Sequence, residues 1–599
     1  MLIGAWGPHA SELLERLAER DSTQVHRIAD LTMMRQPDVI EGSWCCWLFG
    51  APEARDELSE RLERTPGESL VASLARSLEV RGAAACELLC GRFVLVALER
   101  EHGRCMVVRD QLGAQSLVHA NVGQGTLFAE HERDLLEALG RTPSPDRLAL
   151  AQWIGNGLTP VGHTLFEDVS RLPAGHMLEL HGTSAAVRRW WQLRYGGTEQ
   201  GSPDSLALLL REQAFAAIGR ASAGSERLAV KLSGGLDSAC VAAGLQARGF
   251  AGRALAFGGT FPEFPEADER ELIRQSAEHA HLSLELIGFD LARSMLDPAI
   301  EHIARWRLPP ATPNTFLWEP LMGRARERGV EVMLDGEGGD ELFGFSPHLI
   351  ADMLRAGHLG KAWALTARMP RLATDTNTRA RLGELRRCGL APLLPSGVRR
   401  RRESSRRERT NASSSIVRLA DAQALADMHE QRIEQRHEGP LWWRSLAESV
   451  IDTRDLLDLG GHYRRAAADE EVDRRHPFLH DLRLIETVLR IPPQLQFDPL
   501  RDRPLLRDAV RGLIPEAVRT RHAKSHFTRL VLAGINGEET GLLAPLGRAD
   551  APVRAFVSEP ALDRRIEVPP AQRPMLGAGS LWRVAIANRW LLAEMERGT

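Results

Sequence analysis

The stretch "AVKLSGGLDSACVAAG", residues 229–244, decides how the second part of this 599-residue chain folds. It reads as an apolar strand, a short loop of Ser and Gly, and a helix that opens on Asp237. Backbone N–H groups in a Gly-rich turn, together with the start of the helix behind it, can converge on an anion. The stretch therefore predicts a strand–loop–helix unit that holds phosphate groups.

The loop lacks the lysine that a Walker loop carries. Gly234 and Gly235 let the backbone approach phosphate oxygens closely, and the hydroxyls of Ser233 and Ser238 can donate hydrogen bonds. The carboxylate of Asp237 would repel phosphates unless a cation lies between them, so we expect Mg²⁺ bound jointly by Asp237 and the phosphates. The alternative is an ordinary turn with Asp as a helix cap. The string SGGLDS is more specific than that, since its chance occurrence in this length is on the order of one in ten thousand.

A second stretch, "VMLDGEGGDELFG" at residues 332–344, repeats the pattern of strand, Gly-rich loop and helix. Asp340 in this loop is the expected second carboxylate on the metal. The segments "RLAVKL", "RALAFGG", "LSLELIGF" and "GVEVML" read as strands separated by helical stretches. This alternation predicts an α/β unit with a doubly wound parallel sheet, followed by a mostly helical part from about residue 415.

The first 195 residues have a different character. "GRFVLVALER", "GRCMVVRDQLG", "GTLFAEH" and "LPAGHMLELHG" read as short strands between Gly-containing turns. Residues 196–205 are polar and rich in Gly and Pro, as expected of a linker. We therefore expect one domain over 1–195, a linker over 196–205 and a second domain over 206–599. The Arg/Ser-rich segment 396–415 is either an exposed mobile loop or a lid or docking strip for an acidic partner.

Composition excludes several classes of function. The net charge is −4, which gives no general case for binding nucleic acid or a membrane surface. The sequence contains no apolar run long enough to cross a bilayer, and its beginning does not resemble a signal peptide. Seven cysteines, an odd number without a CxxC pair, argue against a disulfide framework or a zinc site. We therefore expect a cytoplasmic protein without nucleic-acid or membrane partners.

The two loops carry a family resemblance. "SGGLDS" resembles the pyrophosphate loop of the asparagine synthetase family, and "DGEGGDELFG" resembles its second signature. The strands of the first domain are similar to that family's glutaminase-type N-terminal domain, and "RPLLRDAVRGLIPEAVRTRHAKSHF" is similar to its C-terminal helical signatures. The resemblance implies an Ntn-hydrolase-like β-sandwich followed by a PP-loop ATP-binding synthetase domain.

The resemblance also implies a reaction. A substrate carboxylate attacks the α-phosphorus of ATP and pyrophosphate leaves, which explains a loop without the Walker lysine. An amine then attacks the acyl-adenylate and expels AMP, leaving an amide.

Roles for individual residues follow from the same resemblance. Glu337 would orient or deprotonate the incoming amine, or else bind a metal or water without a proton role. Lys524 would neutralise charge on the α-phosphate as pyrophosphate leaves, and Arg521 would support phosphate. The remaining nucleotide contacts are expected from Leu232 and Phe257 at strand ends near adenine, from Ser233, Gly234, Gly235, Asp237 and Ser238 at the pyrophosphate, and from Asp335, Gly336 and Arg507.

The chain departs from the family at its start. Glutamine-using members begin with a cysteine nucleophile, whereas this sequence begins Met1-Leu2-Ile3-Gly4. We therefore expect an amine other than ammonia from glutamine. In β-lactam synthetases the second signature resembles Gly-Tyr-Gly-Ser-Asp, but Glu337 stands at the position of that Tyr, which disfavours this branch. Lasso-peptide cyclases resemble the chain in length, in the missing cysteine and in "GGDELF".

The leading hypothesis is thus an ATP-dependent lasso-peptide cyclase. It would join an Asp or Glu side chain of a core peptide to the peptide's N-terminal amine as a macrolactam. Its expected partners are the core peptide, a leader-binding protein and a leader peptidase. Two alternatives stay open: a small-molecule amide synthetase, either ammonia-dependent or β-lactam-forming, and an inactive binding scaffold. The intact SGGLDS, Asp340 and Lys524 count against the scaffold.

Overall fold

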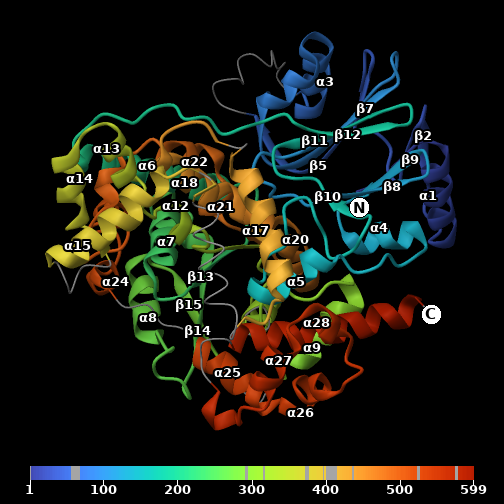
Figure 1. Ribbon diagram of the computed structural model, residues 1–599. Helices are drawn as coiled ribbons and strands as arrows, with labels where there is room; N and C mark the ends of the chain where they lie inside the picture. The colour runs from blue at the N-terminus through green and yellow to red at the C-terminus, as the bar shows by residue number, and fades with distance from the viewer. Residues whose placement is uncertain are drawn as a thin grey trace.

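Figure 1 shows the computed structural model of the chain, with strands of the N-terminal part in blue and the C-terminal helices in red. The structure describes residues 2–54, 68–289, 294–313, 318–370, 377–395, 397–398, 415–434, 437–522, 527–573 and 578–598. Lys524 and nearly all of the segment 396–415 lie outside the described residues. Among the described helices, none combines the length and apolar character that crossing a bilayer requires.

The N-terminal part contains two antiparallel six-stranded sheets. The first has the order β10-β8-β9-β1-β3-β2 and the second β12-β11-β7-β6-β5-β4. The first sheet consists of β1 (Ile3–Trp6), β2 (His26–Ile28), β3 (Leu31–Met33), β8 (Val118–Val122), β9 (Gly125–Ala129) and β10 (Ser170–Arg171). The second consists of β4 (Val39–Glu41), β5 (Trp44–Ala54), β6 (Leu89–Glu99), β7 (Arg104–Arg109), β11 (His176–His181) and β12 (Ser184–Arg189). The four strands predicted here are confirmed as β6, β7, β9 and β11.

The apolar run of β6 is explained by burial on both faces. Val94, Val96 and Leu98 lie in a core between the two sheets, together with residues of the first sheet. Phe93, Leu95 and Ala97 point the other way and pack with α3 (Leu70–Arg81). A strand covered on both sides cannot show the alternation of a half-exposed strand. The sandwich is therefore a layered unit with helices outside.

The second part is built on a parallel sheet of five strands in the order β15-β14-β13-β16-β17. Helices cover both faces. Side chains of α6 (Pro203–Ser222), α7 (Leu236–Ala247) and α8 (Arg270–His279) form the core on one face. α11 (Glu319–Glu327) packs on Ala229, Phe257 and Met333 on the other. The strands are β13 (Leu228–Leu232), β14 (Ala254–Thr260), β15 (Ser283–Gly288), β16 (Val332–Leu334) and β17 (Asp473–Arg475). The predicted doubly wound parallel sheet is confirmed.

Three details differ from the sequence predictions. β14 continues through Gly258 and Gly259 to Thr260, because both glycines pair in register with β15, so Phe257 lies within the strand and not at its end. β17 was not predicted, since three charged residues paired to one neighbour show no strand pattern. α6 begins at Pro203, inside the predicted linker, where Ser202 caps it by accepting from the N–H of Ser205 at 3.1 Å.

The two parts meet across an extensive junction. The last helix, α28 (Ala578–Gly598), packs on α5 (Arg147–Asn156) of the N-terminal part and on α9 (Leu296–Trp306) (Figure 1). Ion pairs also cross it: buried Arg109 reaches buried Asp455 at 3.2 Å, and partly exposed Arg92 reaches Asp473 next to the parallel sheet at 3.0 Å. Removing one partner of a buried pair costs about 3–5 kcal/mol, so the contact between Arg109 and Asp455 in particular fixes how the parts are oriented.

Candidate active site

Sheet topology brings the two Gly-rich loops together. β13 and β16 are parallel neighbours, with Leu228 opposite Val332 and Val230 opposite Leu334. Each strand is followed at once by its loop, so both loops emerge at the carboxyl edge of the sheet. This edge is where open α/β sheets bind ligands.

The loop after β13 is a tight turn that depends on glycine. Gly234 has φ +72°, a left-handed conformation that a residue with a side chain rarely adopts. The N–H of Ser233 donates to the hydroxyl of Ser238 at 3.2 Å, and the two hydroxyls lie 3.1 Å apart. The turn therefore closes on itself directly before the start of α7, and the N-terminal end of a helix is a position that favours an anion.

The loop after β16 packs directly on the first loop. A Cβ at Gly336 would lie 2.6 Å from the backbone N of Ser238 and 2.7 Å from Cβ of Asp237. A Cβ at Gly339 would lie 2.4 Å from Cγ of Asp237. All three distances are shorter than non-bonded atoms tolerate, so only glycine permits this approach at positions 336 and 339. The short helix α12 (Gly339–Leu342) then carries Asp340.

Gly336→Ala is expected to separate the two loops. Overpacking of this kind costs about 1–3 kcal/mol of stability, and nucleotide binding should weaken at least about tenfold because the loops no longer share one site. Thermal unfolding and ATP binding by calorimetry measure the two effects. Gly323→Ala on α11 is the matched control, since a Cβ there meets nothing within 4 Å. Equal behaviour of the two variants would show that the close approach does not matter.

A cavity of about 540 Å³ lies over the two loops. Most residues predicted for the site line it: Ser233, Gly234, Gly235, Asp237, Ser238, Asp335, Gly336, Glu337, Asp340, Arg507 and Arg521. The side chains of Leu232 and Phe257 do not, because both are fully buried in the cores beside the sheet. Their expected contact with adenine can therefore involve only their backbone.

The two predicted arginines, Arg507 and Arg521, form hydrogen bonds and an ion pair with other residues of the protein. The guanidinium of Arg507 donates to the carbonyl of Asp502 at 2.8 Å, and also to the carboxylate of Asp502 and the carbonyl of Arg519. Arg521 pairs with Glu269 at 2.5 Å. Arg507 is buried, so it holds the loop that precedes it as well as lining the cavity.

The carboxylates of Asp237 and Asp340 converge on one cation. The guanidinium of Arg503 contacts Asp237 and lies 2.9 Å from Asp340. Burial alone would lower the pKa of Arg503, but the charges of Asp237 and Asp340 raise the pKa above its usual value. The position between the two carboxylates is thus one that selects positive charge. Two carboxylate oxygens suit Mg²⁺, which commonly takes one or two carboxylates and fills its shell with water and phosphate oxygens.

Asp335 is held as a carboxylate at the base of the cavity. Burial would raise its pKa, but His476, at 2.7 Å, and Lys231, at 3.6 Å, hold the pKa of Asp335 below its usual range. It also accepts from the N–H of Glu337 at 3.1 Å, which shapes the second loop. The ring of Tyr463 lies against His476, with centroids 3.8 Å apart. A hydrogen bond, an ion pair and a ring contact therefore join Asp335, Lys231, His476 and Tyr463 on the buried side of the cavity.

Glu337 stands at the exposed side of the same cavity. Its side chain is 52% exposed, and one carboxylate oxygen lies 3.8 Å from Nζ of Lys231. The side chain of Lys231 is 12% exposed, and its ammonium lies 5.0 Å from the ring centre of Trp318. A half-exposed carboxylate can bind an incoming amine or move a proton, as its predicted role requires.

Sequence reasoning missed Lys231 and Arg503. Lys231 lies on β13 two residues before the first loop, in the position of an ordinary strand residue. Arg503 lies in "RDRPLL" some 266 residues beyond Asp237, and only the fold brings the two together. The one signal in the sequence is that Arg503 begins "RPLLR", the start of a stretch already singled out by the family resemblance.

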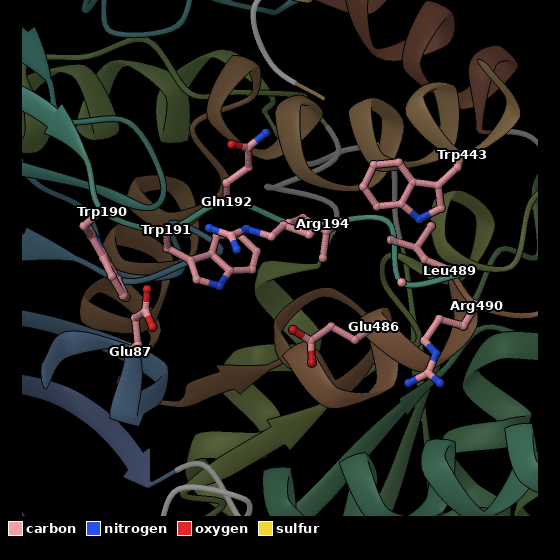
Figure 2. Close-up of a pocket in the computed structure, with 11 residues that line it drawn as sticks. Glu87, Trp190, Trp191, Gln192, Arg194, Trp443, Glu486, Leu489 and Arg490 are labelled. Atoms are coloured by element: carbon pink, nitrogen blue, oxygen red, sulfur yellow. The ribbon is translucent and has the colours of Figure 1, made fainter. Parts of the chain in front are cut away.

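A second cavity, of about 410 Å³, lies where the two parts of the chain meet. Figure 2 shows Trp190 and Trp191, just after β12, on one side and Trp443 on the other, with the carboxylate of Glu486 between them. Arg194 and Arg490 add positive charge to the same surface (Figure 2). Among the described residues, this cavity shares no lining residue with the one over the loops.

The cysteines offer no activated thiol. All seven are buried. Burial raises the pKa of the Cys86 thiol to about 12, and it raises the pKa values of Cys46 and Cys105 as well. Since the thiolate is the nucleophile, these side chains are inert at neutral pH.

Fold and site together define a two-part chain that joins an amidotransferase-like sandwich to a parallel-sheet unit with two Gly-rich loops at the carboxyl edge of its sheet. Residues 209–592 match the family described as Asparagine synthase, and residues 47–191 match the Glutamine amidotransferase domain. The first match covers well over half of the sequence, so the chain belongs to the asparagine synthase family. Members of this family generally form amide bonds at the expense of ATP.

Individual relatives are distant. Asparagine synthetase [glutamine-hydrolyzing] 2 of Bacillus subtilis (strain 168) is 22% identical over 495 residues, covering 77% of this chain and 59% of that protein. Amidase chyE of Penicillium rubens is 24% identical over 289 residues, covering 44% and 41%. The chain thus spans about half of the length of these relatives. A solved glutamine phosphoribosylpyrophosphate amidotransferase from B. subtilis has 12% identity, covers 59% of this chain and 77% of its own, and has a TM-score of 0.21.

Proposed function

We propose that this protein is an ATP-dependent, AMP-forming ligase that closes a peptide into a macrolactam, as lasso-peptide cyclases do. The carboxylate of an Asp or Glu side chain would be adenylated, and the peptide's own N-terminal amine would then displace AMP. The observation that carries the proposal is the convergence of Asp237, Asp340 and Glu337 on one cavity beside a phosphate-binding loop. Incubation with ATP and a leader-free peptide tests it.

Each part of the cavity suits one step of this reaction. The loop Ser233–Ser238 would hold the pyrophosphate that leaves, with Asp237 and Asp340 holding Mg²⁺. When bound, the metal supplies positive charge to the departing phosphates. Asp335 and Gly336 keep the two loops in contact, and Glu337 would receive the amine. Lys524, outside the described residues, is proposed to stabilise the α-phosphate.

The identity of the amine separates this proposal from glutamine-dependent synthesis. All seven cysteines are buried, and burial raises the pKa values of Cys46, Cys86 and Cys105, so none of these three is a ready thiolate to attack glutamine. An amine carried by the substrate itself removes the need for ammonia. The same bound molecule then supplies both reacting groups, which raises their effective concentration greatly. The proposed partners are the core peptide, a leader-binding protein and a leader peptidase.

Glutamine is expected to have no effect on the reaction. Product formation should change by less than about twofold when glutamine or ammonium is added, because neither supplies the amine. The measurement is glutamate release, together with product yield by mass spectrometry. Glutamate above the background of heat-inactivated protein would reveal a nucleophile and contradict the proposal.

A small-molecule amide synthetase is the second candidate. It is favoured by the relatives named asparagine synthetases, whose site would activate free aspartate. Glu337 would then bind ammonium. The two candidates share adenylation and differ in the substrate, so substrate competition assays distinguish them.

A further inference from the structure

Arg503 occupies the centre of the site. Its guanidinium contacts the carboxylate of Asp237, lies 2.9 Å from that of Asp340 and lies 2.6 Å from that of Asp502. The residue is 6% exposed, while Asp340 beside it is 57% exposed in its side chain. A buried positive charge is thus placed between the two carboxylates that are proposed to hold Mg²⁺.

The backbone around Arg503 is built to keep it there. Arg503 has φ +49° and ψ +51°, a left-handed conformation that is uncommon for a residue with a side chain. It directly precedes Pro504 and α23 (Pro504–Ala509). Arg507, one turn further on, bonds to both the carbonyl and the carboxylate of Asp502 and so fixes the partner of Arg503. Conformations of this kind persist where the surrounding structure enforces them, often at functional sites.

We propose that the Arg503 guanidinium holds the cation position between Asp237 and Asp340 in the ligand-free protein, and that it yields this position to Mg²⁺ only when ATP binds. The inference rests on the proposed ATP- and metal-binding role of this site. Arg503 is in this view a positioning residue. It keeps two carboxylates together that would otherwise repel each other, and it makes metal binding depend on nucleotide.

Electrostatic interactions explain why metal binding should depend on ATP. Metal alone must displace the guanidinium, which would leave buried Arg503 with Asp502 in place of three carboxylate partners, and a buried charge that loses partners is costly. The phosphates of ATP change this balance, because they bind the metal and also offer anionic oxygens to the displaced guanidinium. ATP and metal should therefore strengthen each other's binding, and this coupling is reciprocal.

Binding of Mn²⁺ to the full chain without ATP tests the proposal. Free Mn²⁺ is measured by electron paramagnetic resonance, since its signal is lost on binding. Arg503→Met should bind Mn²⁺ at least about tenfold more tightly than the unchanged protein, while Arg503→Lys, which keeps the charge, should bind weakly. The matched control is Arg501→Met. Arg501 lies two residues away and pairs with Asp498 and Asp508, so this variant loses the same charge outside the cation position.

Two further measurements complete the test. Asp340→Asn added to Arg503→Met should remove the gained Mn²⁺ affinity. The factor by which α,β-methylene-ATP strengthens Mn²⁺ binding should shrink by about tenfold in Arg503→Met. Equal Mn²⁺ affinity in Arg503→Met and Arg501→Met overturns the proposal. The metal measurement without nucleotide uses no peptide and no turnover, so failure to cyclise a peptide would count against the proposed function alone.

Discussion

Replacing Asp340 by alanine is expected to lower ATP turnover by about 10²–10³-fold or more and to leave the protein folded. Asp340 and Asp237 converge on the guanidinium of Arg503, so the position between the two carboxylates accepts positive charge. Without Asp340, the proposed metal would lose one of its two protein carboxylates, and the departing pyrophosphate would lose charge stabilisation. Folding should be nearly unaffected, because the Asp340 side chain is 57% exposed.

The measurement is pyrophosphate release with saturating ATP and peptide, alongside thermal unfolding. Asp297→Ala is a suitable control, since Asp297 is an exposed carboxylate at the same position in the first turn of α9. That variant should retain full activity and unfold at the same temperature. Near-normal turnover by Asp340→Ala would remove Asp340 from the site and with it the proposed metal position.

The second large effect concerns the substrate. A leader-free peptide with a free N-terminal amine and an acidic side chain should yield AMP, pyrophosphate and a product lighter by one water. An acyl-adenylate hydrolyses readily, so productive closure needs the amine held near the acyl carbon with water excluded. The amine must also be neutral when it attacks, and Glu337 is placed to take its proton.

Acetylating the peptide's amine separates the two half-reactions. Adenylation should continue, seen as exchange of labelled pyrophosphate into ATP, while ring closure stops. A peptide with its acidic side chain replaced by an amide should support neither step. If the protein instead converts free aspartate and ammonium to asparagine and ignores such peptides, the macrolactam proposal fails and the small-molecule synthetase stands.

Much of the fold was predictable because its signals are local. SGGLDS and DGEGGD each sit between an apolar strand and a helix, and the alternation of such units implies a parallel sheet. The strands of the sandwich were predictable from apolar runs between Gly turns. The misreadings have equally local causes: Phe257 was placed at a strand end although the strand continues through the glycines that pair with β15, and β17 is short and charged.

For the candidate site, too, some features follow from the local sequence and others only from tertiary contacts. The sequence by itself determined the two Gly-rich loops that follow strands and the carboxylates that they carry, because those properties belong to residue type and to the order strand, Gly-rich loop, helix. Only the tertiary structure decided what stands between the carboxylates. Asp237, Asp340 and Arg503 meet because β13 and β16 are neighbours and because the turn before α23 points Arg503 inward. Such contacts depend on packing between segments far apart in the chain, and a local pattern carries no record of that packing.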